Sequence, residues 1–240
     1  MGKRLYETIG ANHTGTGLLL ENDGYASIDM PENKVLKESI DKFNSGLAND
    51  LPNPFVVSAV FQKYGIKNAN GRIYPEDILR REVERYQKNI RERRAFGECE
   101  HPSDANVNLE RVCMNIIELH WVGHTLIGKI ELPITEGFRR YGICSNFADT
   151  VAQWIISGLR IGVSSRALGS VSQKGDALIV NDDLEIICWD CVSTPSTPLA
   201  YIDKDEESLR PFIQETIETD SQNIINENSK FSKFKEWLKD

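Results

Sequence analysis

The sequence predicts an α+β fold, with a mainly antiparallel, barrel-like β core surrounded by a few helices. Two observations lead to this class. Apolar runs typical of strands outnumber segments with helical periodicity, and short turns that suit hairpins separate neighbouring strand-like runs. The chain has 240 residues, of which 40% are hydrophobic and 27% are charged, so it can bury one sizeable core.

The first predicted strand is residues 55–61. This run is rich in β-branched residues and has turn residues on both sides. Residues 112–122 and 125–132 are expected to form a hairpin whose turn is Gly123-His124. The remaining strands are expected at residues 161–171, 177–180 and 184–192.

Three segments show helical periodicity. An amphipathic helix is expected to open near Pro31, and a second should begin at Pro75 and run to about Arg94. A third is expected after Ser145, whose hydroxyl can cap it. The side predicted to be buried in this third helix consists of Phe147, Val151, Trp154, Ile155 and Leu159.

Composition divides the chain into three parts. Residues 1–50 are an N-terminal extension that contains the first amphipathic helix, and residues 51–202 are the main domain. Residues 203–240 are an acidic, polar tail. The tail is expected to end in a short amphipathic helix whose apolar face is Phe231, Phe234, Trp237 and Leu238.

The charge and the apolar pattern exclude several classes of partner. A formal net charge of −8 argues against a general nucleic-acid binder, because phosphate contacts need clustered Lys and Arg. The sequence contains no apolar run of about 18 residues and no apolar signal-peptide region, so we expect a cytoplasmic protein without a membrane partner. Five cysteines, an odd number, are expected to be reduced thiols.

Two short segments offer a base and a nucleophile. His101 precedes Pro102, whose ring favours an extended conformation for the residue before it, so the imidazole can project from a strand end or a loop. Ser164 and Ser165 alternate across a predicted strand, so only one of them can face the site. A serine hydroxyl becomes a good nucleophile when an imidazole takes its proton. Arg166 can orient the site or present its backbone N–H to an oxyanion, unless it is an ordinary exposed or salt-bridged arginine.

Asp190 is the candidate for the acid that orients the imidazole. It lies in the apolar run 184–192, where a buried carboxylate needs a partner to remain charged. Strand alternation places it on one face with Ile186 and Cys188. A structural salt bridge is the alternative role for Asp190, and the alternative acids are Asp183 and Glu185.

Five separated segments carry a resemblance to a known family. They are NANGRIYP at 68–75, GECEHP at 97–102, NV at 106–107, GVSSRALGS at 162–170 and PSTP at 195–198. In these segments and their order, residues 55–202 resemble the prohead proteases of tailed bacteriophages, which are similar in fold to the herpesvirus assemblins. Ala167 stands where those phage enzymes commonly have glycine.

The resemblance implies a serine endopeptidase that needs no cofactor and cleaves scaffold, capsid and other prohead proteins. It favours Ser164 as the nucleophile and implies a location inside the assembling prohead, in the host bacterial cytoplasm. A homo-oligomer is possible by the same resemblance. Members of the family often cut themselves after a glutamate preceded, two positions earlier, by an aliphatic residue. The glutamates that fit this pattern are Glu7, Glu21, Glu215 and Glu227.

Two other functions stay open. The chain could be a catalytically inactive scaffold or core component of the prohead, although the presence of both His101 and Ser164 argues against this. A zinc hydrolase would need to gather its ligands from Cys99, His101, Cys113, His120 and His124, and the sequence lacks an H-E-x-x-H signature. The Cys188 and Cys191 pair does not suggest a metal, because strand geometry sends the two thiols to opposite faces.

Overall fold

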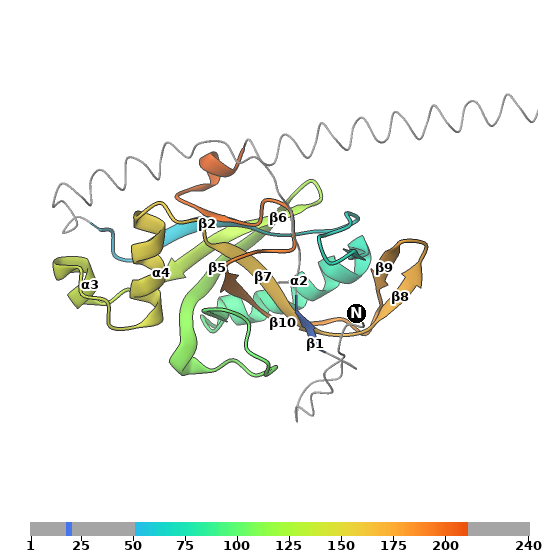
Figure 1. The fold of residues 1–240 in the computed structure, drawn as a ribbon, viewed down its shortest axis with the longest axis horizontal. Helices are drawn as coiled ribbons and strands as arrows, with labels where there is room; N and C mark the ends of the chain where they lie inside the picture. The colour runs from blue at the N-terminus through green and yellow to red at the C-terminus, as the bar shows by residue number, and fades with distance from the viewer. Residues whose placement is uncertain (1–17, 21–50, 211–240) are drawn as a thin grey trace, which may run out of the picture.

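The computed structural model describes residues 18–20 and 51–210, which form a mixed α+β fold (Figure 1). Five strands form the largest sheet, in the order β11-β2-β6-β5-β4, and all of their pairings are antiparallel. These strands are β2 (Phe55–Lys63), β4 (Phe96–Glu98), β5 (Val112–Val122), β6 (Thr125–Leu132) and β11 (Ile202–Asp203).

A second sheet carries the candidate site. Its order is β1-β7-β10, with β1 at Leu18–Leu20, β7 at Gly162–Leu168 and β10 at Glu185–Val192, all antiparallel. The third sheet is small and projects at one end of the molecule (Figure 1). In it, β9 (Ala177–Val180) pairs in parallel with β3 (Arg72–Ile73) and antiparallel with β8 (Val171–Lys174).

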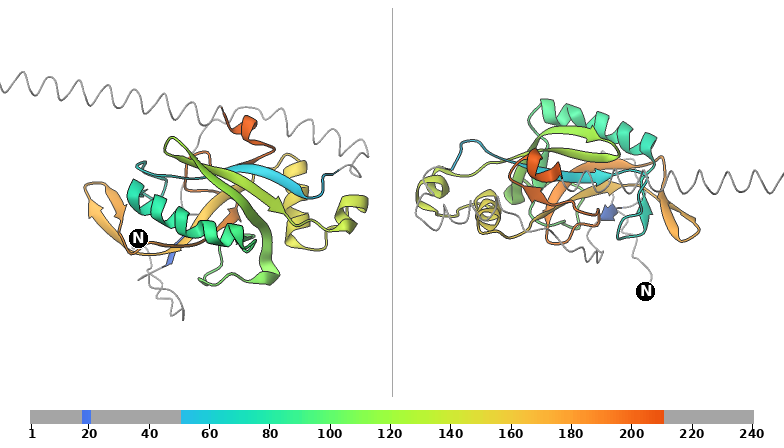
Figure 2. Two further views of the ribbon diagram at one scale, coloured as in Figure 1. Left: turned by 180° about the vertical axis from the view of Figure 1, so that it is seen from behind. Right: turned by 90° about the horizontal axis from the view of Figure 1, so that it is seen from above.

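The helices are α2 (Glu76–Arg91), α3 (Glu136–Tyr141) and α4 (Phe147–Ile156), with a 3₁₀ turn at Leu109–Arg111. Figures 1 and 2 show α3 and α4 at the end of the molecule opposite β8 and β9, and α2 along one face of the sheets. The core lies between α2 and the strands. Within it, the Trp189 ring meets the rings of Phe61 and Tyr86 edge-on, at centroid distances of 5.8 Å and 5.0 Å.

The prediction of an α+β class with mainly antiparallel strands is confirmed, but the barrel-like core is not. Among the described residues the strands form open sheets, and the two larger sheets meet where Cys99, just after β4, bridges to Cys191 of β10. Alternation of apolar and polar residues indicates strands. It does not show whether the first and last strands of a sheet pair with each other, and this pairing is what closes a barrel.

The predicted hairpin at residues 112–132 is confirmed, and Gly123 takes the positive φ of 57° that its turn needs. The segment predicted as one strand at 161–171 instead holds β7 and the start of β8. The predicted helix after Pro31 and the amphipathic end at 231–238 lie outside the described residues. No helix in the described ranges is long and apolar enough to span a membrane.

Helix α4 corrects the prediction made for its cap and its buried side. Its cap is Asn146, whose side-chain oxygen accepts the Asp149 backbone N–H at 2.7 Å, whereas Ser145 donates to the Asp149 carboxylate. Of the five residues predicted to be buried, only Val151 and Ile155 are. The other buried residues of α4 are Ala148, Asp149, Ala152 and Ile156, so the buried face is rotated from the predicted one.

Two of the five motif segments form one structural unit. The side-chain oxygen of Asn68 accepts the backbone N–H groups of Asn70 and Arg72, at 3.0 and 2.9 Å, and closes a tight turn. The next backbone N–H, of Ala69, donates to the carbonyl of Ser196 at 3.0 Å. The segments at 68–75 and 195–198 are thus joined directly, which gives both a structural role.

Candidate active site

The pairing of β7 with β10 decides which serine faces Asp190. Ser164 lies directly opposite Asp190, and Ser165 lies opposite Trp189. Residues directly opposite in an antiparallel pair point to the same face, and neighbours along a strand point to opposite faces. Ser164 therefore shares a face with Asp190, while Ser165 shares a face with a tryptophan of the main core.

His101 reaches the same carboxylate from the loop that follows β4. The backbone N–H of Glu100 donates to the carbonyl of Cys191 at 2.8 Å, which fixes the loop against β10. Glu100 itself has a left-handed φ of 64°, which turns the chain at this point. The next residue is His101, whose Nδ1 lies 2.7 Å from Oδ2 of Asp190.

Gly97 permits this close approach of β4 to β10. A Cβ atom at this position would lie 2.2 Å from the backbone oxygen of Trp189 and 2.4 Å from Cε of Met114. The methionine side chain can move, but the Trp189 oxygen belongs to the strand that carries Asp190. Any larger residue at position 97 would therefore push the histidine loop and the acid apart.

The Asp190 carboxylate is fully buried and well supplied with donors. Its Oδ1 accepts the backbone N–H of Glu98 at 2.9 Å and Nη2 of Arg166 at 3.2 Å, and the Cys188 thiol lies 3.3 Å away. Burial raises the pKa of this carboxyl, but the hydrogen bond with His101 and the Arg166 charge outweigh it, so the pKa of Asp190 is lower than usual. Asp190 is consequently an anion at neutral pH.

The charge on Asp190 fixes the tautomer of His101. A carboxylate can only accept, so Nδ1 must carry the proton that it donates to Oδ2. The lone pair of the neutral imidazole is then on Nε2. This atom is buried and has no hydrogen-bond partner among the residues that the structure describes. A base with its lone pair available and its other nitrogen held by an acid suits proton abstraction from a hydroxyl.

Arg166 is a fully buried guanidinium between two buried carboxylates. Its Nη2 donates to Oε1 of Glu98 at 2.7 Å, and its Nε lies 3.0 Å from Oδ2 of Asp190. Its Nη1 donates to the carbonyl oxygens of Asp104 and Asn106, at 2.8 and 3.2 Å. Arg166 thus lies at the site as a buried, ion-paired residue and contacts the acid rather than water.

The faces of β10 differ in part from the prediction. Ile186 pairs with Ala167 and Cys188 pairs with Arg166, so Ile187 is an extra residue that forms a β-bulge. Cys188 shares the face of Asp190, as predicted, but Ile186 does not, because the bulge reverses the alternation and Ile186 joins the main core. A bulge adds one residue to a strand, and the apolar pattern of the sequence does not show where this happens.

The other acids predicted for this site lie elsewhere. Asp183 accepts the backbone N–H and the hydroxyl of Ser170, both at 3.0 Å. Oε1 of Glu185 lies 3.8 Å from Nη2 of Arg85, at the edge of a cavity. The four glutamates predicted as self-cleavage sites, Glu7, Glu21, Glu215 and Glu227, lie outside the described residues.

The alternative chemistries gain no support from the geometry. Burial raises the pKa of the Cys99 thiol to about 11, so Cys99 is a poor source of thiolate. The Cys188 and Cys191 side chains lie on opposite faces of β10, as predicted. Within the described ranges, the predicted zinc ligands do not come together: the one group with ligand spacing is Glu118, His120 and Glu206, and only His120 belongs to that set.

Two buried glutamates, Glu98 at the site and Glu82 at the start of β10, were missed by the sequence analysis. Glu98 accepts from Arg166 and from the backbone N–H of Asn108, at 2.9 Å for the latter. Glu82 of α2 accepts the backbone N–H of Ile186 at 3.1 Å, just before the bulge. Glu82 stands on the apolar face of its helix, a position that could have indicated a buried carboxylate with a partner.

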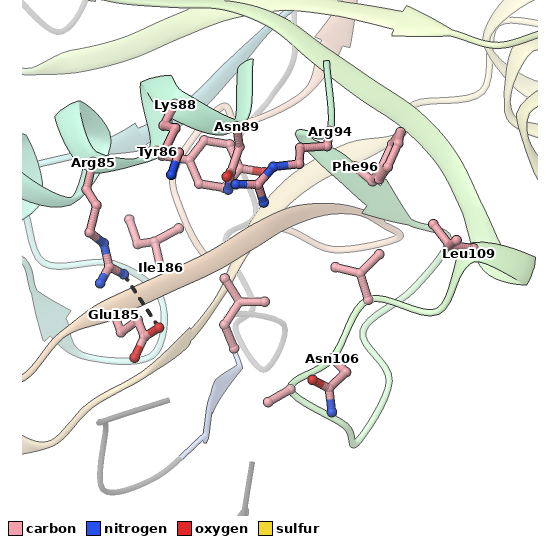
Figure 3. Close-up of a pocket in the computed structure, with 13 residues that line it drawn as sticks. Arg85, Tyr86, Lys88, Asn89, Arg94, Phe96, Asn106, Leu109, Glu185 and Ile186 are labelled. Atoms are coloured by element: carbon pink, nitrogen blue, oxygen red, sulfur yellow. Dashed lines mark ion pairs between the residues drawn. The ribbon is translucent and has the colours of Figure 1, made fainter. Parts of the chain in front are cut away.

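A cavity of about 470 Å³ lies beside this network and does not include His101, Ser164 or Asp190 (Figure 3). Figure 3 shows α2, the start of β10 and the loop of Asn106 around it, with the Arg85 and Glu185 ion pair at its edge. The catalytic candidates thus do not line this cavity.

Comparison with known proteins identifies the family of this chain. A model of the prohead core protein serine protease family matches residues 18–209. The prohead core protein protease of Enterobacteria phage T4 is 30% identical over 188 residues, which cover 77% of this chain and 82% of the phage protein. The solved structure of the bacteriophage T4 capsid assembly protease is 26% identical and covers 74% of this chain and 98% of its own, with a TM-score of 0.55. The chain therefore belongs to the prohead core protein serine proteases and is a protease of phage head maturation.

Proposed function

We propose that this protease is a serine endopeptidase in which Ser164 is the nucleophile, His101 the general base and Asp190 the acid that orients His101. The observation that carries the proposal is the contact between Nδ1 of His101 and Oδ2 of Asp190, made on the strand face that Ser164 shares. The family description, which names serine proteases, supports the same catalytic type.

The reaction follows from the protonation states. Nε2 of His101 takes the proton from Ser164 as Oγ forms a bond to the peptide carbonyl carbon. The imidazolium is stabilised by the Asp190 anion and then gives the proton to the leaving amine as the C–N bond breaks. Water hydrolyses the resulting ester by the same steps and releases the new carboxyl terminus. Arg166 acts through Asp190, which it holds charged and in place.

We further propose that the substrates are the scaffold and major capsid proteins of the prohead. The family and its phage relatives carry prohead and capsid assembly in their descriptions, and this supports proteins packed beside the enzyme as its substrates. Limited cleavage of such proteins would convert a labile shell into a mature one. No metal or cofactor enters any of these steps.

The test compares two adjacent serines. Ser164→Ala should lower the cleavage rate of denatured prohead proteins by a factor of about a million, to a level that is hard to detect. Ser165→Ala is the matched control, because it removes the same hydroxyl from the opposite face of the same strand, and it should keep most of the activity. Normal cleavage by Ser164→Ala would refute the nucleophile assignment. An inactive wild-type protein would favour the scaffold component instead.

A further inference from the structure

The cavity between helix α2, the start of β10 and the loop at residues 105–109 has no part in the proposed mechanism (Figure 3). Its volume is about 470 Å³, which is within the range of ligand pockets in proteins. The side chains that line it differ between its floor and its rim, and the two parts select different chemical groups.

The floor of the cavity is apolar and rigid. Tyr86, Ile186 and Ala105 are buried, at 3%, 5% and 1% exposure. The Tyr86 ring also meets the ring of Trp189 edge-on in the main core, so this wall cannot move without disturbing the core. An aliphatic or aromatic side chain that entered the cavity would bury apolar surface against this floor.

The rim of the cavity is cationic. Its basic residues are Arg85, Lys88 and Arg94, and each of these side chains is more than half exposed. Glu185 is the one acidic residue among the described residues that line the cavity. Lys88 and Arg94 pair with Glu92, which is itself exposed, and exposed ion pairs of this kind are weak. An arriving carboxylate can therefore replace Glu92 at this rim.

Two polar groups at the cavity have hydrogen bonds to offer. Within the described part of the chain, neither the Tyr86 hydroxyl nor the Asn89 side chain has a hydrogen-bond partner. Burial raises the pKa of Tyr86, so its hydroxyl stays neutral and can donate. The Asn89 amide can both donate and accept, which suits the main chain of a peptide. Together with the floor and the rim, these groups fit an extended peptide in which carboxylates stand next to apolar side chains.

The wall of the cavity packs against the face of β7 that carries Ser164. Ala105 and Ile187, which line the cavity, pack with Leu168. Leu168 is four residues after Ser164, and alternate residues of a strand share a face, so the two side chains lie on one face, roughly 13 Å apart along the strand. A single polypeptide can therefore fill the cavity and still present another peptide bond, several residues away, to Ser164.

We propose that this cavity docks an acidic, apolar segment of the protein substrates, several residues away from the bond that is cut. The inference rests on the proposed function for the protein substrates. Docking holds the substrate chain beside the catalytic groups and raises the local concentration of its scissile bond. It therefore acts on the KM of whole proteins and not on the chemical step. Short peptides that carry only the cleavage site gain nothing from it.

Binding is measured with the full-length Ser164→Ala protein, so no cleavage is needed. The probe is a fluorescent synthetic peptide, PFIQETIETD, which has the sequence of residues 211–220 and combines apolar residues with three acids. The control peptide, PFIQQTIQTN, replaces the three acids with their amides. Anisotropy should show saturable binding of the acidic peptide, at least about tenfold tighter than that of the control peptide. Equal affinities for the two peptides, or no binding of the acidic peptide to any form of the protein, would overturn the proposal.

Variants of the protein locate the binding. Lys88→Gln with Arg94→Gln should weaken binding of the acidic peptide at least about tenfold. The matched control is Arg91→Gln with Arg140→Gln, which removes the same charge from exposed residues outside the cavity. Asn89→Trp places a bulky side chain in the cavity without a change of charge, and it should also weaken binding. Equal affinity in the two double variants would show nonspecific attraction and refute the site.

The same assay identifies other occupants. A single-stranded oligothymidylate that competes fully with the peptide would reveal a general anion site. Peptide binding that appears only after Glu215→Gln, Glu218→Gln and Asp220→Asn are introduced into the chain would identify its own segment as the occupant. A dimer that Lys88→Gln with Arg94→Gln dissociates would place a second copy at the cavity. Each of these results would overturn substrate docking.

Kinetics separate docking from the chemical step. With Ser164 present, Lys88→Gln with Arg94→Gln should raise the KM for prohead proteins at least about fivefold and change kcat little. The increase should be absent for a decapeptide that spans one cleavage site mapped in those proteins. An unchanged KM for the whole proteins, or the same increase for both substrates, would contradict docking.

The two proposals fail in different ways. If the serine mechanism is wrong, Ser164→Ala still cleaves prohead proteins, while the acidic peptide still binds at the cavity. If docking is wrong, prohead proteins are still cleaved in a Ser164-dependent manner, but neither peptide affinity nor KM responds to the loss of Lys88 and Arg94.

Discussion

Arg166→Met would remove the guanidinium that lies between two fully buried carboxylates, those of Glu98 and Asp190. Breaking a buried ion pair by removing one partner costs about 3–5 kcal/mol, because the remaining charge is left buried. Glu98 keeps Arg111 near its Oε2 and Asp190 keeps His101, so the lower end, about 3 kcal/mol, is expected. For a domain of 150–250 residues this corresponds to a fall in Tm of about 6–12 °C.

The pH dependence of this loss has a definite sign. In the wild type the pKa of Asp190 is lowered, so its contribution to stability is fully present above the unfolded value of about 3.9 and is lost as pH falls through the folded value. Without Arg166 one of the influences that lower the pKa of Asp190 is gone, so this pKa is higher in the variant than in the wild type, although the hydrogen bond with His101 still lowers it. Asp190 is therefore protonated at a higher pH in the folded variant than in the folded wild type, and its protonation removes the buried charge, so the stability difference between wild type and variant should shrink as pH falls toward the acid range.

Chemical denaturation at several pH values measures this difference. A second substitution, Glu98→Gln in the Arg166→Met background, should recover at least about 1 kcal/mol, because it removes one of the two buried charges that have lost Arg166. Arg139→Met is the control, since it breaks an exposed ion pair with Glu136 and should change stability by less than about 1 kcal/mol. A stability difference that is constant or grows toward acid would refute the argument that Arg166 holds Asp190 charged.

Three further predictions concern the same site. Gly97→Ala should lower both Tm and activity, because the added Cβ would lie 2.2 Å from the Trp189 oxygen. Gly142→Ala, at a φ of 68° in open space, should cost about 1 kcal/mol and leave activity unchanged. Equal losses of activity in the two variants would contradict this. Cys99→Ser should remain active and iodoacetamide at pH 7.5 should not inhibit the wild type, since burial raises the pKa of Cys99 to about 11; inhibition that Cys99→Ser abolishes would point to a cysteine nucleophile. Asp190→Asn should fold but lose about 10⁴-fold in kcat, because the amide no longer fixes the tautomer of His101; turnover near the wild-type rate would leave Asp190 a structural residue.

The features that the sequence predicts well are those written into local patterns. The hairpin of β5 and β6 follows from two apolar runs and a glycine turn, and β10 follows from an apolar run between polar residues. The motif segments indicate Ser164 and His101 because these are the residue types that a hydrolytic site needs. Asp190 stands out as a carboxylate in an apolar strand, where it needs a partner.

The features that the sequence leaves open depend on pairing between distant segments. Alternation shows that Ser164 and Ser165 face opposite ways, but only the register with β10 shows which one faces the acid. β4 is three residues long, too short for its apolar pattern to be recognised, although it brings Glu98 to Arg166. The bulge at Ile187 likewise depends on the partner strand, because nothing in one strand alone marks a residue as unpaired.

At Glu100, the stability of the fold and the accurate positioning of His101 have opposite requirements. A non-glycine residue with a left-handed φ costs roughly 1–2 kcal/mol, and this one immediately precedes His101. Its carboxylate accepts the backbone N–H of Ser193 at 3.1 Å, so the strained turn is also tied to the end of β10. Replacing Glu100 with glycine would relieve the strain and keep the backbone bond to Cys191, yet it would remove the hydrogen bond to Ser193 and make the turn that positions the imidazole less rigid. Stabilised variants selected for heat resistance alone would therefore tend to acquire glycine here and become slower enzymes.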